Sequence, residues 1–160
     1  MIFNIKVKED NINFAKKQIN AFKKIPQGKH RYTNVEAWRG IVCEILTTEW
    51  LSNKYNIPLK AKGLDNSGNY DEYDLLINGK KIEIKSATKH YFKYIMPKVY
   101  DVIDKPKDIF ICSRYNETKS PNEVEVVGWI KREDAMKYTI EQNKGAKYYK
   151  IPIKDLNKFE

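Results

Sequence analysis

The chain has 160 residues, of which 41% are hydrophobic and 32% are charged, as expected for one globular domain with its own core. Its 30 lysines and arginines outnumber its 21 acidic residues, and the net charge of +9 favours a polyanionic partner such as nucleic acid, although a basic chain can also serve solubility alone. We find no apolar run of about 18 residues and no secretion signal, so we expect a cytoplasmic protein without a membrane span.

Two helices are predicted in the first third of the chain. Residues 9–25 place apolar side chains at helical spacing with lysines on the other side, which predicts an amphipathic helix. The sequence Thr33-Asn34-Val35-Glu36 matches a capping box, in which Thr33 caps the first turn of a second helix and Glu36 reaches back. We expect this second helix to run to about Lys54.

The remaining pattern alternates strands with one more helix. It predicts a strand at residues 58–64, a hairpin at 72–87, buried strands at 108–113 and 124–130, a helix at 131–143 that stops at Gly145, and a last strand at 148–153. These elements predict an α/β fold with a mixed sheet flanked by helices. We divide the single domain into an N-terminal helical extension (1–33), a core (34–113) and a C-terminal strand-helix-strand elaboration (114–160).

The predicted hairpin fixes the relative positions of two acidic residues. Asn78-Gly79 between two strand-like runs is a strong signal for a two-residue turn. With this turn, Asp74 lies directly opposite Glu83, and Lys85 shares a face with Glu83 because strand side chains alternate. The apolar residues of the hairpin then lie on the other face.

Two opposed carboxylates are unfavourable unless something compensates their charge, and a divalent cation does so. Mg²⁺ prefers oxygen ligands and combines one or two carboxylates with phosphate oxygens, which suits Asp74 and Glu83. Lys85 could then orient the attacking water and stabilise charge on the phosphate. The alternative is a solvent-facing hairpin in which Lys81 and Lys85 neutralise the neighbouring acids by cross-strand pairing.

The pattern resembles the PD-(D/E)XK nuclease superfamily, with Asp74 as its first acidic residue and Glu83-Ile84-Lys85 as its ExK element. Tyr73 stands where many members have proline. The resemblance covers residues 34–113 and implies a restriction endonuclease-like core in the order αβββαβ. It also implies a Mg²⁺-dependent hydrolase that cuts DNA, in which Asp74, Glu83 and the Ile84 carbonyl hold the metal, Mn²⁺ can substitute, and Lys85 positions the nucleophilic water.

Members of this superfamily commonly add a glutamate from the helix before the hairpin. Glu44 fits this role because helical spacing puts it in line with residues expected to face the protein, and Glu49 is the alternative. Similarity to small members, such as restriction-type enzymes and Holliday junction resolvases, implies an endonuclease that acts as a homodimer. Two other functions stay open, namely a non-catalytic DNA-binding module and a junction resolvase or recombination subunit with the same fold.

The stretch after the ExK element interleaves cations with aromatic residues from Lys89 to Tyr100. Its basic side chains could meet phosphates while its rings stack on bases, or its rings could be buried in the core, and the sequence favours neither. The DNA-binding candidates are Ser86, Thr88, Lys89, His90 and Lys93.

Overall fold

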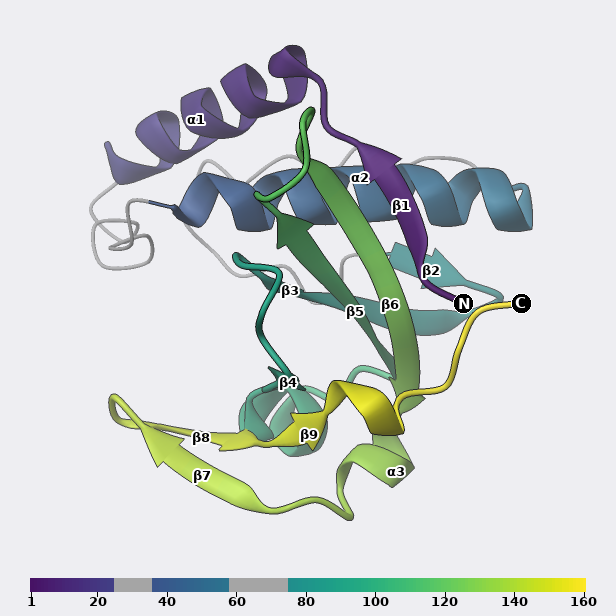
Figure 1. Ribbon diagram of the computed structural model, residues 1–160. Helices are drawn as coiled ribbons and strands as arrows, with labels where there is room; N and C mark the ends of the chain where they lie inside the picture. Colours follow the sequence, from purple (N-terminus) through teal and green to yellow (C-terminus); the bar gives the residue numbers. More distant parts are fainter. Residues whose placement is uncertain (25–35, 58–74) are drawn as a thin grey trace.

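The structure is a computed structural model that describes residues 1–24, 36–57 and 75–160 (Figure 1). In chain order its elements are β1 (Phe3–Lys6), α1 (Glu9–Lys23), α2 (Ala37–Tyr55), β2 (Leu75–Ile77), β3 (Lys80–Ala87), β4 (Tyr94–Ile95), a π-helix (Tyr100–Asp104), β5 (Ile109–Asn116), β6 (Glu123–Lys131), α3 (Arg132–Ala135), β7 (Ile140–Asn143), β8 (Ala146–Tyr149), β9 (Ile151–Pro152) and a 3-10 helix (Ile153–Asp155).

A five-stranded sheet crosses the molecule in the order β1-β6-β5-β3-β2. β3 and β5 are parallel, and every other neighbouring pair in this sheet is antiparallel. The parallel pair requires a crossover, which here is made by β4 and the π-helix. The predicted α/β class with a mixed sheet is therefore confirmed.

Helices α1 and α2 cover one face of the sheet (Figure 1). On this face Leu51 of α2 packs in a buried cluster with Ile82 and Ile84 of β3. Leu51 and Ile82 are almost fully buried. Burying each such side chain contributes about 1.5–3 kcal/mol, so this contact fixes which face of β3 turns toward α2.

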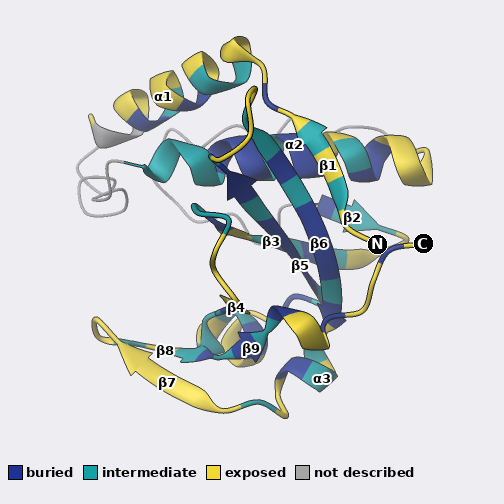
Figure 2. Cartoon of the chain, viewed as in Figure 1, coloured by how far each residue is buried: buried dark blue, intermediate teal, exposed yellow. Residues whose placement is uncertain are grey.

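A second layer covers the opposite face. It contains β4 paired with β9, the π-helix, α3 and the β7–β8 hairpin. Val102 of the π-helix and Ile151 of β9 pack there against Phe110 of β5, and all three are buried. Figure 2 shows β5 and β6 largely buried between the two layers, whereas β7 is exposed.

The predicted amphipathic helix is confirmed over Glu9–Lys23, but the capping box of the second helix is wrong. α2 begins at Ala37, so Glu36 is its N-cap rather than its third residue, and its side chain makes no cap hydrogen bond. The Glu36 carboxylate lies 3.4 Å from Arg39 and 3.2 Å from Lys89 instead, because two cations offer it stronger partners than a backbone N–H. Thr33 lies outside the described residues.

The hairpin register is confirmed for the residues that the structure describes. Leu75 pairs with Ile82, Leu76 with Lys81 and Ile77 with Lys80. Asn78 and Gly79 form the turn, and both have positive φ angles, of 49° and 76°. Asp74 and the predicted strand at 58–64 lie outside the described residues.

The predictions for β5 and β6 are also confirmed, and both strands extend further than expected. The predicted strand at 108–113 continues to Asn116, and β6 covers Glu123–Lys131. The sequence pattern missed β1, a four-residue strand that pairs with β6 and alternates between half-buried and exposed positions. Its short length gives too few residues to reveal a period.

The predicted helix at 131–143 is wrong beyond its first turn. α3 ends at Ala135, and Ile140–Asn143 forms β7, which pairs with β8. Gly145, expected to end a helix, is a turn residue, since Lys144 and Gly145 have φ angles of 49° and 81°. Met136 and Ile140 are exposed, so no apolar helix face exists here to be buried. The predicted strand at 148–153 is split between β8 and β9.

None of the helices within residues 1–24, 36–57 and 75–160 is long and apolar enough to cross a membrane.

Candidate functional site

Strand β3 turns Glu83 and Lys85 away from α2. Ile82 and Ile84 are buried against the helix layer, and alternation along the strand puts Glu83 and Lys85 on the opposite face. Phe110 and Cys112 of the parallel strand β5 pair with Glu83 and Lys85 and are fully buried. The two charged side chains therefore emerge from an apolar floor.

Four charged groups of alternating sign form a connected cluster at this face. Lys85 Nζ donates to Glu83 Oε1 at 3.0 Å and to Asp101 Oδ2 at 3.3 Å. Lys107 Nζ donates to the other oxygen of Asp101, Oδ1, at 2.8 Å. The side chains of Glu83, Lys85 and Asp101 are only 13–24% exposed, and that of Lys107 is 4% exposed. We call these four residues the acid–lysine cluster.

Asp101, a member of this cluster, was not predicted as a site residue from the sequence. It lies in the π-helix, a rare conformation that occurs frequently at functional sites. Burial opposes ionisation of Asp101, but the ammonium groups of Lys85 and Lys107 outweigh it and hold the pKa of this carboxyl below its ordinary value. A single aspartate at this position has no local sequence signal, because its contact with Lys85 exists only in the folded chain.

Backbone hydrogen bonds hold the π-helix against β3. Lys107 N donates to the Asp101 carbonyl at 3.0 Å, which closes the loop after the helix. The next residue, Asp108, donates its N–H to the Lys81 carbonyl at 2.8 Å and accepts the Lys81 N–H on Oδ2 at 2.7 Å. This double link ties the loop to the start of β3, so Asp101 and Lys85 face each other across a fixed gap.

Glu44 lies on α2, which packs against the face of β3 opposite Lys85. It is half-buried on α2, and a Cβ atom at Gly40, one turn earlier, would lie 3.3 Å from Ser86 Oγ. Ser86 has the same strand parity as Ile82 and Ile84, so α2 approaches β3 from the face opposite Lys85. The alternative, Glu49, is exposed. The place of Glu44 in a metal shell stays a prediction.

The DNA-binding candidates lie along the chain directly after the cluster strand. Lys89 pairs with Glu36 at 3.2 Å, and His90 Nδ1 lies 2.8 Å from Glu117 Oε1. The Thr88 carbonyl accepts from Arg39 Nη1 at 3.1 Å. Ser86 and Lys93 are exposed. These residues follow one another along the chain, and two of them already have partners within the protein: Lys89 forms an ion pair with Glu36, and His90 forms a hydrogen bond with Glu117.

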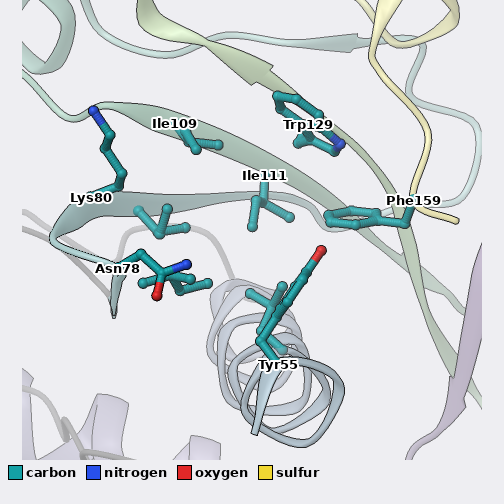
Figure 3. Close-up of a pocket in the computed structure, with 10 residues that line it drawn as sticks. Tyr55, Asn78, Lys80, Ile109, Ile111, Trp129 and Phe159 are labelled. Atoms are coloured by element: carbon teal, nitrogen blue, oxygen red, sulfur yellow. The ribbon is translucent and has the colours of Figure 1, made fainter. Parts of the chain in front are cut away.

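A separate apolar pocket of about 260 Å³ lies between the C-terminal end of α2 and the sheet (Figure 3). Tyr55, Trp129 and Phe159 line it together with Ile82, and Lys80 and Asn78 stand at the hairpin side. Ile82 belongs to the face of β3 that α2 covers. The pocket and the acid–lysine cluster therefore lie on opposite faces of the sheet.

The predicted metal ligands include residues inside and outside the ranges that the structure describes. Within the described ranges, no three histidine, cysteine, aspartate or glutamate side chains gather into a group that could hold a metal ion. Asp74, the predicted partner of Glu83, lies outside those ranges. The structure describes the other predicted ligands, and the side chains of Glu83 and Glu44 are both half-buried.

Comparisons with known proteins give no match: no family model, no curated protein and no solved structure is similar to this chain.

Proposed function

We propose that the chain is a Mg²⁺-dependent endodeoxyribonuclease whose working face is that of Glu83 and Lys85. The observation that carries this proposal is the position of the Lys85 ammonium, 3.0 Å from Glu83 and 3.3 Å from Asp101 in a half-buried setting. A lysine beside carboxylates on one strand face is the arrangement that phosphodiester hydrolysis uses for charge stabilisation. It also matches the resemblance to the PD-(D/E)XK superfamily.

We also propose that the fold has a restriction endonuclease-like core in the order αβββαβ. In its support, α2 precedes the β2–β3 hairpin, and the π-helix precedes β5, which runs parallel to β3. The first of the three expected strands falls outside the described residues. The short π-helix stands where the second helix of that order is expected.

The residues fit a hard divalent cation. Glu83 offers carboxylate oxygens, the ligands that Mg²⁺ prefers, and its side chain is 16% exposed, so an ion and a phosphate can reach it. The confirmed register of Leu75, Leu76 and Ile77 is the one on which the opposition of Asp74 and Glu83 depends. Asp74, Glu83 and the Ile84 carbonyl are the proposed direct ligands, for Mg²⁺ or for Mn²⁺. Glu44, whose helix packs on the other face of β3, is proposed to complete the shell through water.

The metal, when bound, offsets negative charge on the scissile phosphate and makes water more acidic. The protein contributes orientation. Lys85 is a compact cation with three donors, and its two carboxylate partners hold it in one direction. With substrate bound, an N–H of this ammonium would point at a phosphate oxygen or at the nucleophilic water. Such a prealigned donor stabilises the developing charge without reorganisation.

The first test is cleavage of supercoiled plasmid by the purified protein with Mg²⁺, with Mn²⁺ and with EDTA. We expect cutting with either metal, none with EDTA, and a loss of roughly 10²–10³-fold in Lys85→Ala, as when one charge-stabilising donor is removed elsewhere. Lys80→Ala is the matched control, because Lys80 is an exposed lysine of the same strand at the rim of the apolar pocket.

Two results would count against the proposal. Unchanged cleavage by Lys85→Ala would remove this lysine from the reaction, and DNA binding without cutting under any metal would leave a non-catalytic DNA-binding module.

The form of the cut plasmid tests whether the enzyme acts as a homodimer. Linear product formed without a nicked intermediate supports a homodimer whose two sites cut both strands. A branched duplex in the same assay tests the junction resolvase alternative.

A further inference from the structure

The connection from β3 to the π-helix carries a series of exposed aromatic rings. Tyr91, Phe92 and Tyr94 are 57%, 42% and 44% exposed, and Tyr100 is 50% exposed. The alternative that the first three rings are core residues is therefore wrong. We call residues 88–100 the aromatic strap, and Figure 2 shows its exposed part running from the end of β3 to β4.

The strap is held at several points, although its rings point outward. Arg114 Nη1 donates to the Phe92 carbonyl at 3.2 Å, and Ile153 N donates to the Lys93 carbonyl at 2.8 Å. Tyr94 pairs with Pro152 in the β4–β9 ribbon. Because the backbone is already fixed, a partner that binds these rings meets a small loss of conformational entropy.

The strap also borders the acid–lysine cluster at both ends. It begins directly after β3, the strand of Glu83 and Lys85, and it ends at Tyr100, next to Asp101. Asp101 in turn contacts Lys85 at 3.3 Å. A chain molecule lying along the strap would therefore have one end close to Lys85.

The chemistry of the strap selects its partner. The chain has a net charge of +9, Lys93 is exposed within the strap, and Lys150 Nζ lies 4.5 Å from the centre of the Tyr94 ring. Rings interleaved with cations complement a polyanion that also presents flat apolar surfaces. Single-stranded nucleic acid has both features, whereas the bases of an intact duplex are already stacked on each other.

We propose that the aromatic strap binds unpaired nucleotides by stacking, so that the substrate is DNA with a single-stranded segment, such as a flap, a branched duplex or a free single strand. That the bound DNA is a substrate rests on the proposed nuclease function. It assigns to Tyr91, Phe92 and Tyr94 the role of base-stacking residues. The phosphates of the same segment would lie near Lys93.

The test is binding of a fluorescent 20-nucleotide single strand and of the matching duplex, measured by anisotropy in EDTA so that no cutting occurs. We expect the single strand to bind more tightly. Tyr91→Leu and Phe92→Leu should each weaken single-strand binding about tenfold, because a base stacked on a ring contributes roughly 1–3 kcal/mol. Leucine keeps an apolar side chain, and circular dichroism confirms that each variant is folded.

Phe14→Leu is the control, since Phe14 is 47% exposed on α1, away from the strap. Equal affinity for duplex and single strand, or equal effects of all three variants, would overturn the stacking role and leave the nuclease proposal standing. Ring-dependent binding of the single strand without cutting under any metal would overturn the nuclease proposal and leave the stacking role in place.

Discussion

The Asp101 carboxylate lies between the ammonium groups of Lys85 and Lys107. The Lys85 side chain is partly exposed, whereas that of Lys107 is buried. The side chain of Lys107 is 4% exposed, and its ammonium lies 2.8 Å from the Asp101 carboxylate. Removing one partner of a buried ion pair leaves an uncompensated charge and typically costs about 3–5 kcal/mol. This cost is independent of any catalytic role.

We therefore predict that Asp101→Asn lowers the free energy of unfolding at neutral pH by about 3 kcal/mol, measured by urea denaturation. Asp104→Asn is the control, because Asp104 is an exposed residue of the same π-helix and should change stability by less than about 0.5 kcal/mol. Equal stability of the two variants would mean that Lys107 finds another partner.

The same carboxylate predicts a pH dependence. Burial opposes its ionisation, yet Lys85 and Lys107 hold the pKa of Asp101 below its ordinary value in the folded chain. Because the folded pKa is lowered, the stabilisation is fully present above the ordinary carboxyl pKa of about 4 and is lost as the pH falls through the folded value.

The stability difference between wild type and Asp101→Asn should therefore be constant near neutrality and narrow below about pH 4. Denaturation curves at a series of pH values measure it. A difference that stays constant down to the acid limit of folding would show that the loss in Asp101→Asn comes from packing rather than charge.

At the scale of elements, two hairpins provide a matched pair of turns. Gly79 and Gly145 have φ angles of 76° and 81°, each follows a residue with a φ angle of 49°, and a Cβ atom at either would meet nothing within 4 Å. Alanine at either position therefore changes backbone strain without changing contacts. We predict that Gly79→Ala and Gly145→Ala each lower stability by about 1–2 kcal/mol in thermal denaturation.

Their effects on function should differ. Gly79 fixes the register of the strand that carries Glu83 and Lys85, whereas Gly145 joins β7 and β8 in the second layer. If the nuclease proposal holds, plasmid cleavage falls in Gly79→Ala and stays unchanged in Gly145→Ala. An equal fall in both would show that activity follows global stability rather than the register.

The contrast between these hairpins also explains which elements could be predicted from sequence. The β2–β3 turn has Asn-Gly, and the apolar residues of β3 alternate with charged ones, so both turn and register were predicted. The β7–β8 turn is Lys144-Gly145 between strands with little apolar alternation, and every residue of β7 is exposed. Without periodic burial, helix-forming residues gave the wrong prediction for 131–143.

Apolar side chains are buried on both faces of the sheet, and the elements that cover the two faces were not equally predictable from the sequence. In the helix layer, α1 was predicted from its amphipathic pattern, and α2 was predicted as a helix although its capping box was wrong. The second layer is assembled from short pieces distant in sequence, such as β4 and β9, which pair through Tyr94–Pro152 and Ile95–Ile151. Two-residue strands have no detectable period, and Asp101 acquires its partners only when this layer forms.

The net charge of +9 could attract DNA as a whole, or single lysines could contact single phosphates, and the salt dependence of DNA binding distinguishes these two cases. Each phosphate that a protein cation neutralises releases counterions, so the logarithm of the binding constant falls linearly with the logarithm of salt concentration, with a slope of about 0.7 per contact for single strands. If the aromatic strap lies on the DNA, Lys93→Gln should reduce the slope for a single strand by about 0.7.

Lys137→Gln removes the same formal charge at a position just after α3. The Lys137 side chain is 74% exposed and pairs with Asp134. The slope should be unchanged in this variant. Equal reductions in the two variants would mean that DNA responds to the total charge of the protein. No reduction in Lys93→Gln would mean that the DNA backbone passes the strap at a distance, so that the exposed rings must act without a neighbouring phosphate contact.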